Sequence, residues 1–187
     1  MNQDLISNLK NNGFEVSVSV SSDDVIKKIH ELIPEGSQVM TMSSTTLDQL
    51  GISQEINESG KYDAIKPKFY AGDAEARHLA SLPDIAIGSV HAVTETGELV
   101  IASATGSQLP AYVFGAKKVI FVVSTKKISG DLTAALKRIY DVVLPLEDAR
   151  ALKAYGVHSG VNKLLILNKE PVASRTHILF VEQDLGF

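Results

Sequence analysis

The amino-acid sequence predicts an α/β protein built on a single, mainly parallel sheet that is flanked by helices. Strand-like and helix-like patterns alternate along all 187 residues. Short apolar runs such as residues 119–123 have the near-continuous apolar character of strands covered on both faces. No repeat, low-complexity tract or linker divides the chain, so we expect one domain over residues 1–187, with a helix in residues 1–13 packing on it.

In the first half of the chain, residues 14–20 alternate apolar and polar side chains, which is the period of a half-buried strand. Ser22 is a candidate helix cap, and the apolar stripe that follows it ends at Pro34. The same reasoning predicts a strand over residues 38–42 and helices over residues 43–50, 52–60 and 74–82.

The second half of the chain is organised around a hairpin. Residues 85–103 consist of an apolar strand, a polar turn at Glu95-Thr96-Gly97 and a second apolar strand, which together form an antiparallel element. We expect the central strands of the sheet to be residues 84–90, 118–123 and 178–181. The remaining expected elements are helices over residues 108–114 and 131–143 and a strand over residues 164–167.

Composition excludes several classes of function. The net charge of -4 argues against a nucleic-acid-binding protein. The absence of cysteine rules out disulfides, thiolate catalysis and Cys-ligated clusters, and the five histidines lack metal-ligand spacing, so we expect no metal. Neither nucleotide-binding glycine motif is present, and no cofactor is expected. Without an apolar run that could span a bilayer, we expect a soluble cytoplasmic protein.

Three loops at strand ends have a composition suited to chemistry, because an open α/β sheet binds ligands at the carboxyl ends of its strands. The first loop contains Ser43, Ser44 and Thr45 at the start of a helix. Hydroxyls and free backbone N–H groups at a helix N-terminus can bind an anion. The alternative is that Ser43 or Ser44 only caps the helix.

The second loop is the hairpin turn. Glu95 follows a buried strand, where a carboxylate can act as a base, an acid or a nucleophile. Glu95, Thr96 and Gly97 also form an ordinary tight turn, in which Gly97 takes a positive φ and Glu95 is solvated. His91 lies in the strand before this turn, either as a packed residue or as a catalytic one.

The third loop contains Thr105, Gly106 and Ser107, where Gly106 allows close approach of the backbone to a ligand and Ser107 can cap a helix. Lys127, next to Lys126, follows a buried strand and either binds an anion or is simply solvated. We expect the three loops to converge on one pocket.

These features together resemble the LUD-domain family, formerly a domain of unknown function, which includes lactate utilisation protein C. The motifs that carry the resemblance are residues 40–47, 88–100, 104–107, 114–123 and 175–187. The resemblance implies a fold similar to the sugar-phosphate isomerase and CoA-transferase-like superfamily. It also implies a link to L-lactate oxidation alongside iron–sulfur oxidoreductase partners. Two departures stand out: residues 154–163 lack the cysteines that some relatives carry, and of an Asn-Lys-Ile motif only Lys127-Ile128 remains.

Three functional hypotheses follow, and whether the chain is an enzyme stays open. The first is a protein that binds a small anionic metabolite and supports metabolism of lactate or a related organic acid. The second is a CoA-transferase-like or sugar-phosphate-handling enzyme, since Glu95 before a glycine turn resembles the placement of the CoA-transferase glutamate. The third is a regulatory or scaffolding subunit. A homo-oligomer is compatible with each of them.

Overall fold

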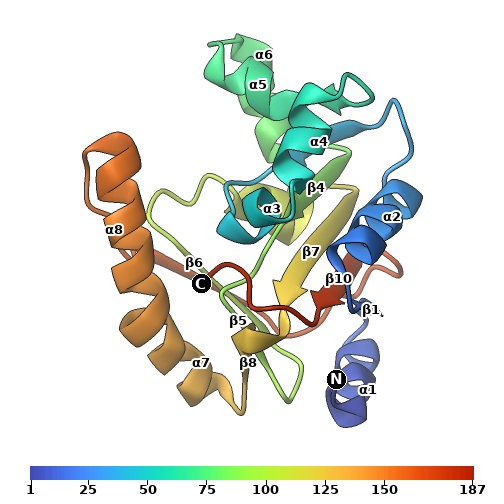
Figure 1. The fold of residues 1–187 in the computed structure, drawn as a ribbon, viewed down its shortest axis with the longest axis vertical. Helices are drawn as coiled ribbons and strands as arrows, with labels where there is room; N and C mark the ends of the chain where they lie inside the picture. The colour runs from blue at the N-terminus through green and yellow to red at the C-terminus, as the bar shows by residue number, and fades with distance from the viewer.

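The computed structural model describes residues 1–187 and contains two sheets. The larger sheet has six parallel strands in the order β1-β10-β7-β4-β2-β3. The smaller, mixed sheet has the order β8-β5-β6-β9. The three strands predicted to be central, β4, β7 and β10, lie side by side in the larger sheet, which confirms the expected fold class (Figure 1).

The elements closely follow the sequence patterns. The strands of the larger sheet are β1 (Glu15–Ser19), β2 (Gln38–Thr41), β3 (Asp63–Ala64), β4 (Ile85–Gly88), β7 (Lys118–Ser124) and β10 (Thr176–Val181). Those of the smaller sheet are β5 (Ala92–Thr94), β6 (Leu99–Ser103), β8 (Ile128–Ser129) and β9 (Lys163–Leu167). The first helices are α1 (Gln3–Asn11), α2 (Ser22–Leu32), α3 (Thr45–Gln49), α4 (Ile52–Glu58), α5 (Ile65–Tyr70) and α6 (Ala74–Ser81).

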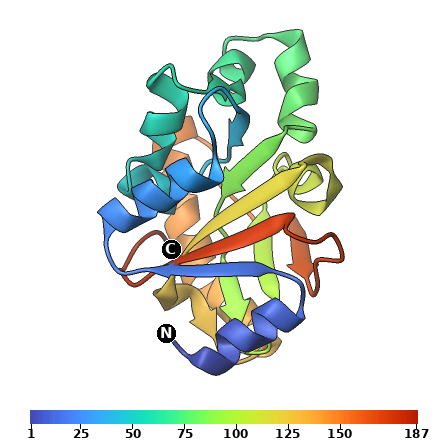
Figure 2. The same cartoon turned by 90° about the vertical axis from the view of Figure 1, so that its right-hand side faces the viewer.

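Alternation along the central strands divides the core into two layers. Ile120 and Val122 of β7 face α2, α3 and α4, whereas Val119, Phe121 and Val123 face the smaller sheet. Successive side chains of a strand point to opposite faces, so both faces of the parallel sheet must be covered. The helices cover one face, and the smaller sheet, together with α1, covers the other (Figure 2).

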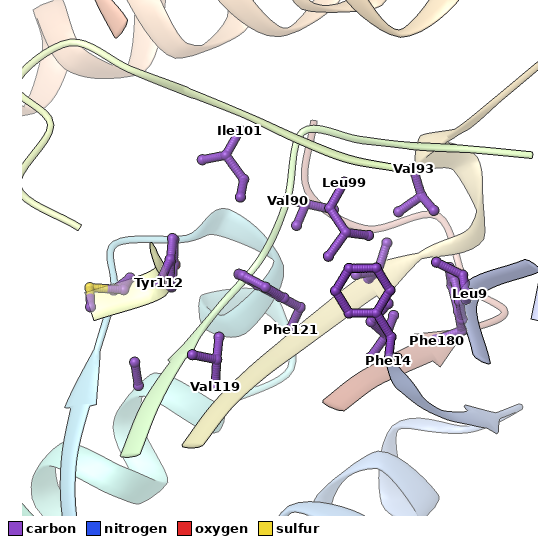
Figure 3. Packing of buried hydrophobic residues seen from close by; sticks show 14 of the residues in the cluster. Leu9, Phe14, Val90, Val93, Leu99, Ile101, Tyr112, Val119, Phe121 and Phe180 are labelled. Atoms are coloured by element: carbon purple, nitrogen blue, oxygen red, sulfur yellow. The ribbon is translucent and has the colours of Figure 1, made fainter. Parts of the chain in front are cut away.

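The core between the two sheets is closed by aromatic residues. Figure 3 shows Phe121 and Phe180 of the larger sheet beneath Val93 and Leu99 of the smaller one. The rings of Phe121 and Tyr112 meet edge to face, with their centroids 4.8 Å apart. Apolar contacts of this kind hold the two sheets together, so the hairpin is a fixed part of the core.

The hairpin belongs to a second sheet that the sequence did not predict. Its outer face packs on α7 (Leu132–Arg138) and the start of the π-helical turn that follows it (Ile139–Val143). This helical segment continues as α8 (Leu144–Tyr155). The helix expected over residues 131–143 therefore continues to Tyr155. Pro145 lies in the first turn of α8, where a proline is tolerated. No helix of the structure is both long and apolar enough to cross a membrane.

The helix expected over residues 108–114 is a π-helical turn, Ala111–Gly115, with a buried arginine at its end. The Arg175 guanidinium donates to the carbonyls of Ala111, Tyr112 and Ala116. It also pairs with Glu170 at 2.8 Å, and both side chains are less than one-tenth exposed. This pair satisfies carbonyl groups that a short, irregular turn would otherwise leave unpaired.

The tip of the hairpin packs on α1. The side chain of Asn8 donates to the carbonyl of Glu95, and that of Asn12 donates to the carbonyls of Thr96 and Gly97. Gly97 has a φ of +95°, and a Cβ there would lie 2.7 Å from Nδ2 of Asn12. Glycine is therefore required at this position both for its backbone conformation and for the close approach of α1.

Gly97→Ala should destabilise the protein more than Gly36→Ala. Gly36 has a φ of +80°, but no atom lies within 4 Å of the position that a Cβ would take, so its substitution adds only backbone strain, roughly 1–2 kcal/mol. At Gly97 the contact with α1 adds about 1–3 kcal/mol of overpacking. Urea denaturation of the two variants measures the difference; equal losses of stability would show that α1 yields without cost.

Candidate functional site

Three neighbouring strands of the larger sheet, β7, β4 and β2, end at the same edge, and polar side chains follow each of them. Lys127 lies in a short 3-10 turn after β7, Ser89 directly follows β4, and Thr46 lies in the first turn of α3 after β2. Parallel strands place their carboxyl ends together, so these loops meet. Together with the end of α7, they form what we call the Lys127 site: Thr46, Ser89, His91, Lys127 and Arg138.

Lys127 is the centre of this site. Its Nζ donates to Oγ1 of Thr46 at 3.0 Å, to Oγ of Ser89 at 3.0 Å and to the carbonyl of Val90 at 3.1 Å. Only 4% of the residue is exposed. All three N–H groups are thus satisfied, but by neutral acceptors.

No carboxylate neutralises Lys127. Burial lowers the pKa of Lys127 to about 7, and the positive charges of Arg138 and Lys126 act in the same direction. The nearby Asp184 pairs with Lys126 instead. Buried charges in proteins are normally paired, so an uncompensated ammonium group at the ligand-binding edge of a sheet indicates a site for an anion.

His91 presents a neutral N–H donor beside Lys127. Its Nδ1 accepts from the backbone N–H of Ala102 at 3.0 Å, which assigns the ring proton to Nε2. Burial, with the positive charges of Lys127 and Arg138, lowers the pKa of His91 to about 3. The imidazole is therefore neutral at physiological pH, and its Nε2–H has no acceptor in the chain.

Arg138, the last residue of α7, contributes a second cation. Its Nη1 donates to the carbonyl of His91 at 2.8 Å, next along the backbone from the carbonyl that Lys127 holds. Burial lowers the pKa of Arg138, although the group stays charged. The other guanidinium N–H groups have no acceptor in the chain and form a fork that suits a carboxylate or a phosphate. The π-helical turn that follows Arg138 is a feature often found at functional sites.

The Lys127 site consequently offers hydrogen-bond donors and positive charge but no acidic group. Such a site attracts an anion and can orient it through Arg138 and the Nε2–H of His91. No group of three or more His, Asp or Glu side chains that could hold a metal ion is present. The chemistry that these residues support is the binding and polarisation of an oxyanion.

The first predicted loop does not contact Lys127 itself, but the residue that follows it, Thr46, does. Ser44 caps α3, accepting from the N–H of Leu47 at 3.4 Å, while Ser43 is exposed and Thr45 is partly exposed. The contact with Lys127 comes from Thr46, the next residue along the chain. The structure thus brings the start of α3 and Lys127 together, a pairing that the expected convergence of the three loops did not include.

The hairpin turn packs on α1 and makes no hydrogen bond with the residues of the Lys127 site. Glu95 is exposed at the tip, its N–H donates to the carbonyl of Ser129 and its carbonyl accepts from Asn8. The Thr96 hydroxyl and the buried Gly97 belong to the same turn. No oxyanion donor from Gly97 faces the Glu95 side chain, since the N–H of Gly97 bonds to the carbonyl of Thr94. A catalytic role for Glu95 remains a prediction without a supporting contact.

The third loop is at the other end of β6 from the hairpin turn. The five residues of β6 separate the two by roughly 17 Å of extended chain, so the three loops do not form one pocket. Thr105 and Ser107 are exposed and bond to each other. Gly106, with a φ of +84°, packs against the side chain of Lys163 of β9. The expected ligand contacts of this loop also remain a prediction.

Sequence reasoning missed Thr46, Ser89 and Arg138. Thr46 follows directly on the first predicted loop, so a signal existed one residue away. Ser89 falls within residues 84–90, which the sequence predicts to be a buried strand, whereas β4 ends at Gly88. Arg138 lies within a predicted amphipathic helix, where a lone arginine is indistinguishable from a solvated one. His91 was considered but could not be assigned, because its partners are set by the second sheet.

Protonation of His91 should destabilise the fold. The pKa of His91 is about 3 in the native protein and 6.5 in the unfolded chain. As the pH falls from 6.5 towards 3, the unfolded chain therefore binds a proton at this residue and the native protein does not, which favours unfolding. His91→Asn keeps an acceptor for Ala102 but does not titrate. Between pH 7 and 4.5 the wild type should lose roughly 2 kcal/mol more unfolding free energy than His91→Asn. Denaturation at both pH values tests this, and parallel losses would contradict it.

The chain is similar to known proteins over nearly its whole length. A DUF162 family protein from Deinococcus radiodurans, known from its crystal structure, matches it with a TM-score of 0.57 and 10% sequence identity, covering 95% of this chain and 94% of that one. At this identity the likeness shows the fold alone. No curated protein matches the chain. The family model of the LUD domain matches residues 3–179, and the chain therefore belongs to the LUD-domain family.

Proposed function

We propose that this LUD-domain protein binds a small anionic metabolite at the Lys127 site and thereby supports the metabolism of L-lactate or a related organic acid. The observation that carries the proposal is the buried ammonium of Lys127 without a carboxylate partner. Two unit charges 4 Å apart near a protein surface interact by about 4 kcal/mol, so an anion here would gain substantially from this charge.

The donors around Lys127 suit a carboxylate that carries an adjacent oxygen. The free N–H groups of Arg138 can hold a carboxylate in a bidentate manner. The Nε2–H of His91 is a neutral donor, which suits a hydroxyl or carbonyl oxygen better than a second charge. A 2-hydroxy or 2-oxo acid presents both groups on adjacent carbons.

Family membership supports the link to lactate, since the LUD domain takes its name from lactate utilisation. The chain has no cysteine to hold an iron–sulfur cluster. Under this proposal it acts in the cytoplasm as a binding subunit, and the redox chemistry is performed by iron–sulfur oxidoreductase partners. The exposed Glu95 has no part in this function.

Binding should depend on Arg138 and Lys127. In a thermal-shift and calorimetry panel of L-lactate, pyruvate, malate, acetate and inorganic phosphate, at least one 2-hydroxy or 2-oxo acid should raise the melting temperature of the wild type. Arg138→Met should weaken that binding roughly ten- to a hundredfold, through loss of a charged hydrogen bond. Lys127→Met should also weaken it, because the positive charge behind the ligand is lost.

Two matched variants serve as controls. Lys137→Met removes one positive charge beside Arg138, but Lys137 is exposed and pairs with Asp141. Glu95→Gln changes the carboxylate that the alternative enzyme hypothesis requires. Both should bind as the wild type does. Binding that fails only in Glu95→Gln would move the site to the hairpin and refute the proposal.

Anion affinity should also fall as the pH rises above about 7. In the free protein the pKa of Lys127 is about 7, so a growing fraction of the lysine is neutral at higher pH. Binding of the anion must then be accompanied by protonation of Lys127, so the affinity decreases as the pH rises. Calorimetry of wild type and Lys127→Met between pH 6.5 and 8.5 tests this: the variant should lack the dependence, and the same slope in both would exclude Lys127 as its origin.

A further inference from the structure

Residues 183–187, which follow β10, turn back across the carboxyl edge of the larger sheet and cover Lys127. In Figure 1 this red segment runs from the end of β10 to the centre of the molecule, between α3 and α8. Gly186 lies directly on the site: a Cβ at this residue would be 2.2 Å from Oγ1 of Thr46 and 3.1 Å from Nζ of Lys127. The backbone of this segment therefore occupies the space in front of the ammonium group.

The contacts that hold the segment go to the loops that form the site. The N–H of Gly186 donates to Oε1 of Gln49 in α3 at 2.7 Å. Ser124, at the end of β7, donates to the carbonyl of Gln183 and accepts from the N–H of Leu185. Asp184 pairs with Lys126, the residue before the buried lysine. The segment thus spans the two loops that contribute Thr46 and Lys127.

The contacts of this segment are few, and those of Asp184 and Gly186 are made with surface residues. The segment has no regular secondary structure, and the side chain of Asp184 is 84% exposed, so its ion pair contributes little. Gln49 is also on the surface. The bonds to the buried Ser124 and the packing of Leu185 on the core hold the segment near β10, whereas Gly186 is held by the bond to Gln49. An irregular segment with so few contacts can open at a lower free-energy cost than the core.

We propose that residues 183–187 form a lid over Lys127, which keeps anions away from the ammonium group when closed and gives access to it when open. Arg138 and His91 stay partly exposed in the closed form, so an anion meets them first. Opening brings water to Lys127, removes the burial that lowers its pKa and restores its full charge. The identity of the anion rests on the proposed function, but the covering of Lys127 does not.

Acylation of lysine amines, read by peptide mass spectrometry, measures the opening directly. In the wild type Lys127 should react far more slowly than the exposed Lys153, because only the open form reacts. Gly186→Ala should raise the rate at Lys127 by roughly tenfold or more, since the added methyl group cannot fit against Thr46 and the lid is displaced. Gln49→Ala, which removes an anchor without backbone strain, should raise it as well.

Gly156→Ala is the matched control. Gly156 has a φ of +72°, close to the +67° of Gly186, but nothing lies within 4 Å of a Cβ there. This variant carries the same kind of backbone strain and should leave the rate at Lys127 unchanged. The lid is refuted if Lys127 reacts as fast as Lys153 in the wild type. It is also refuted if neither Gly186→Ala nor Gln49→Ala raises the rate at Lys127 above the slow rate of the wild type.

A second arm separates the lid from its ligand. L-lactate or inorganic phosphate, added to Gly186→Ala, should slow the acylation of Lys127 but not that of Lys153. Protection by either probe supports the lid as the gate of an anion site. Fast acylation that neither probe slows would support the covering of Lys127 by the segment and refute the proposed anionic ligand.

Discussion

The ammonium group of Lys127 bonds to two other segments of the chain, the start of α3 and the loop after β4, and the arrangement of the site depends on it. Its acceptors are a hydroxyl at the start of α3, the Ser89 hydroxyl after β4 and the carbonyl of Val90. Because the charge is buried, leaving any of these bonds unmade would be costly. The loops after β7, β4 and β2 are therefore fixed relative to one another before any ligand binds, which is the preorganisation that binding requires.

The layered core explains why this charge can be held away from water. β7 is covered on one face by helices and on the other by the smaller sheet, and its residues from Val119 to Ser124 are all buried. Lys127 leaves the sheet from this strand, between the two layers. A lysine at the end of an edge strand would remain solvated and would keep an ordinary pKa.

The smaller sheet determines the other half of the site. Hydrogen bonds from β6 orient His91, and α7, packed on the outer face of β5 and β6, brings in Arg138. The hairpin carries the most characteristic motif of the sequence, and it supplies His91 to the site from the start of its first strand. Its turn, which contains Glu95, packs on α1 instead. The motif at residues 88–100 therefore includes two residues of the site, Ser89 and His91, but not Lys127 or Arg138.

Much of the fold could be predicted from the sequence because its signals are local. The alternation in residues 14–20 and the apolar run at 119–123 each concern neighbouring residues, and each corresponds to an element of the structure. The helix α2 also begins where its signal predicted, although Ser21 caps it and Ser22 is its first residue. The second sheet could not be predicted, because the residues of β9 pair with those of β6 that lie 60 to 68 positions earlier in the chain. The continuation to Tyr155 was missed since Pro145 usually marks a helix end.

Lys126 and Lys127 show where the sequence stops being informative. As adjacent lysines after a buried strand they are equivalent in the sequence, which determined only that positive charge would lie at the carboxyl edge of the sheet. The tertiary structure decided that Lys126 is exposed and pairs with Asp184, whereas Lys127 is buried beneath Gly186 and bonds to Thr46. The physical reason is that burial and charge pairing depend on groups far away in the chain, whose positions only the folded core fixes.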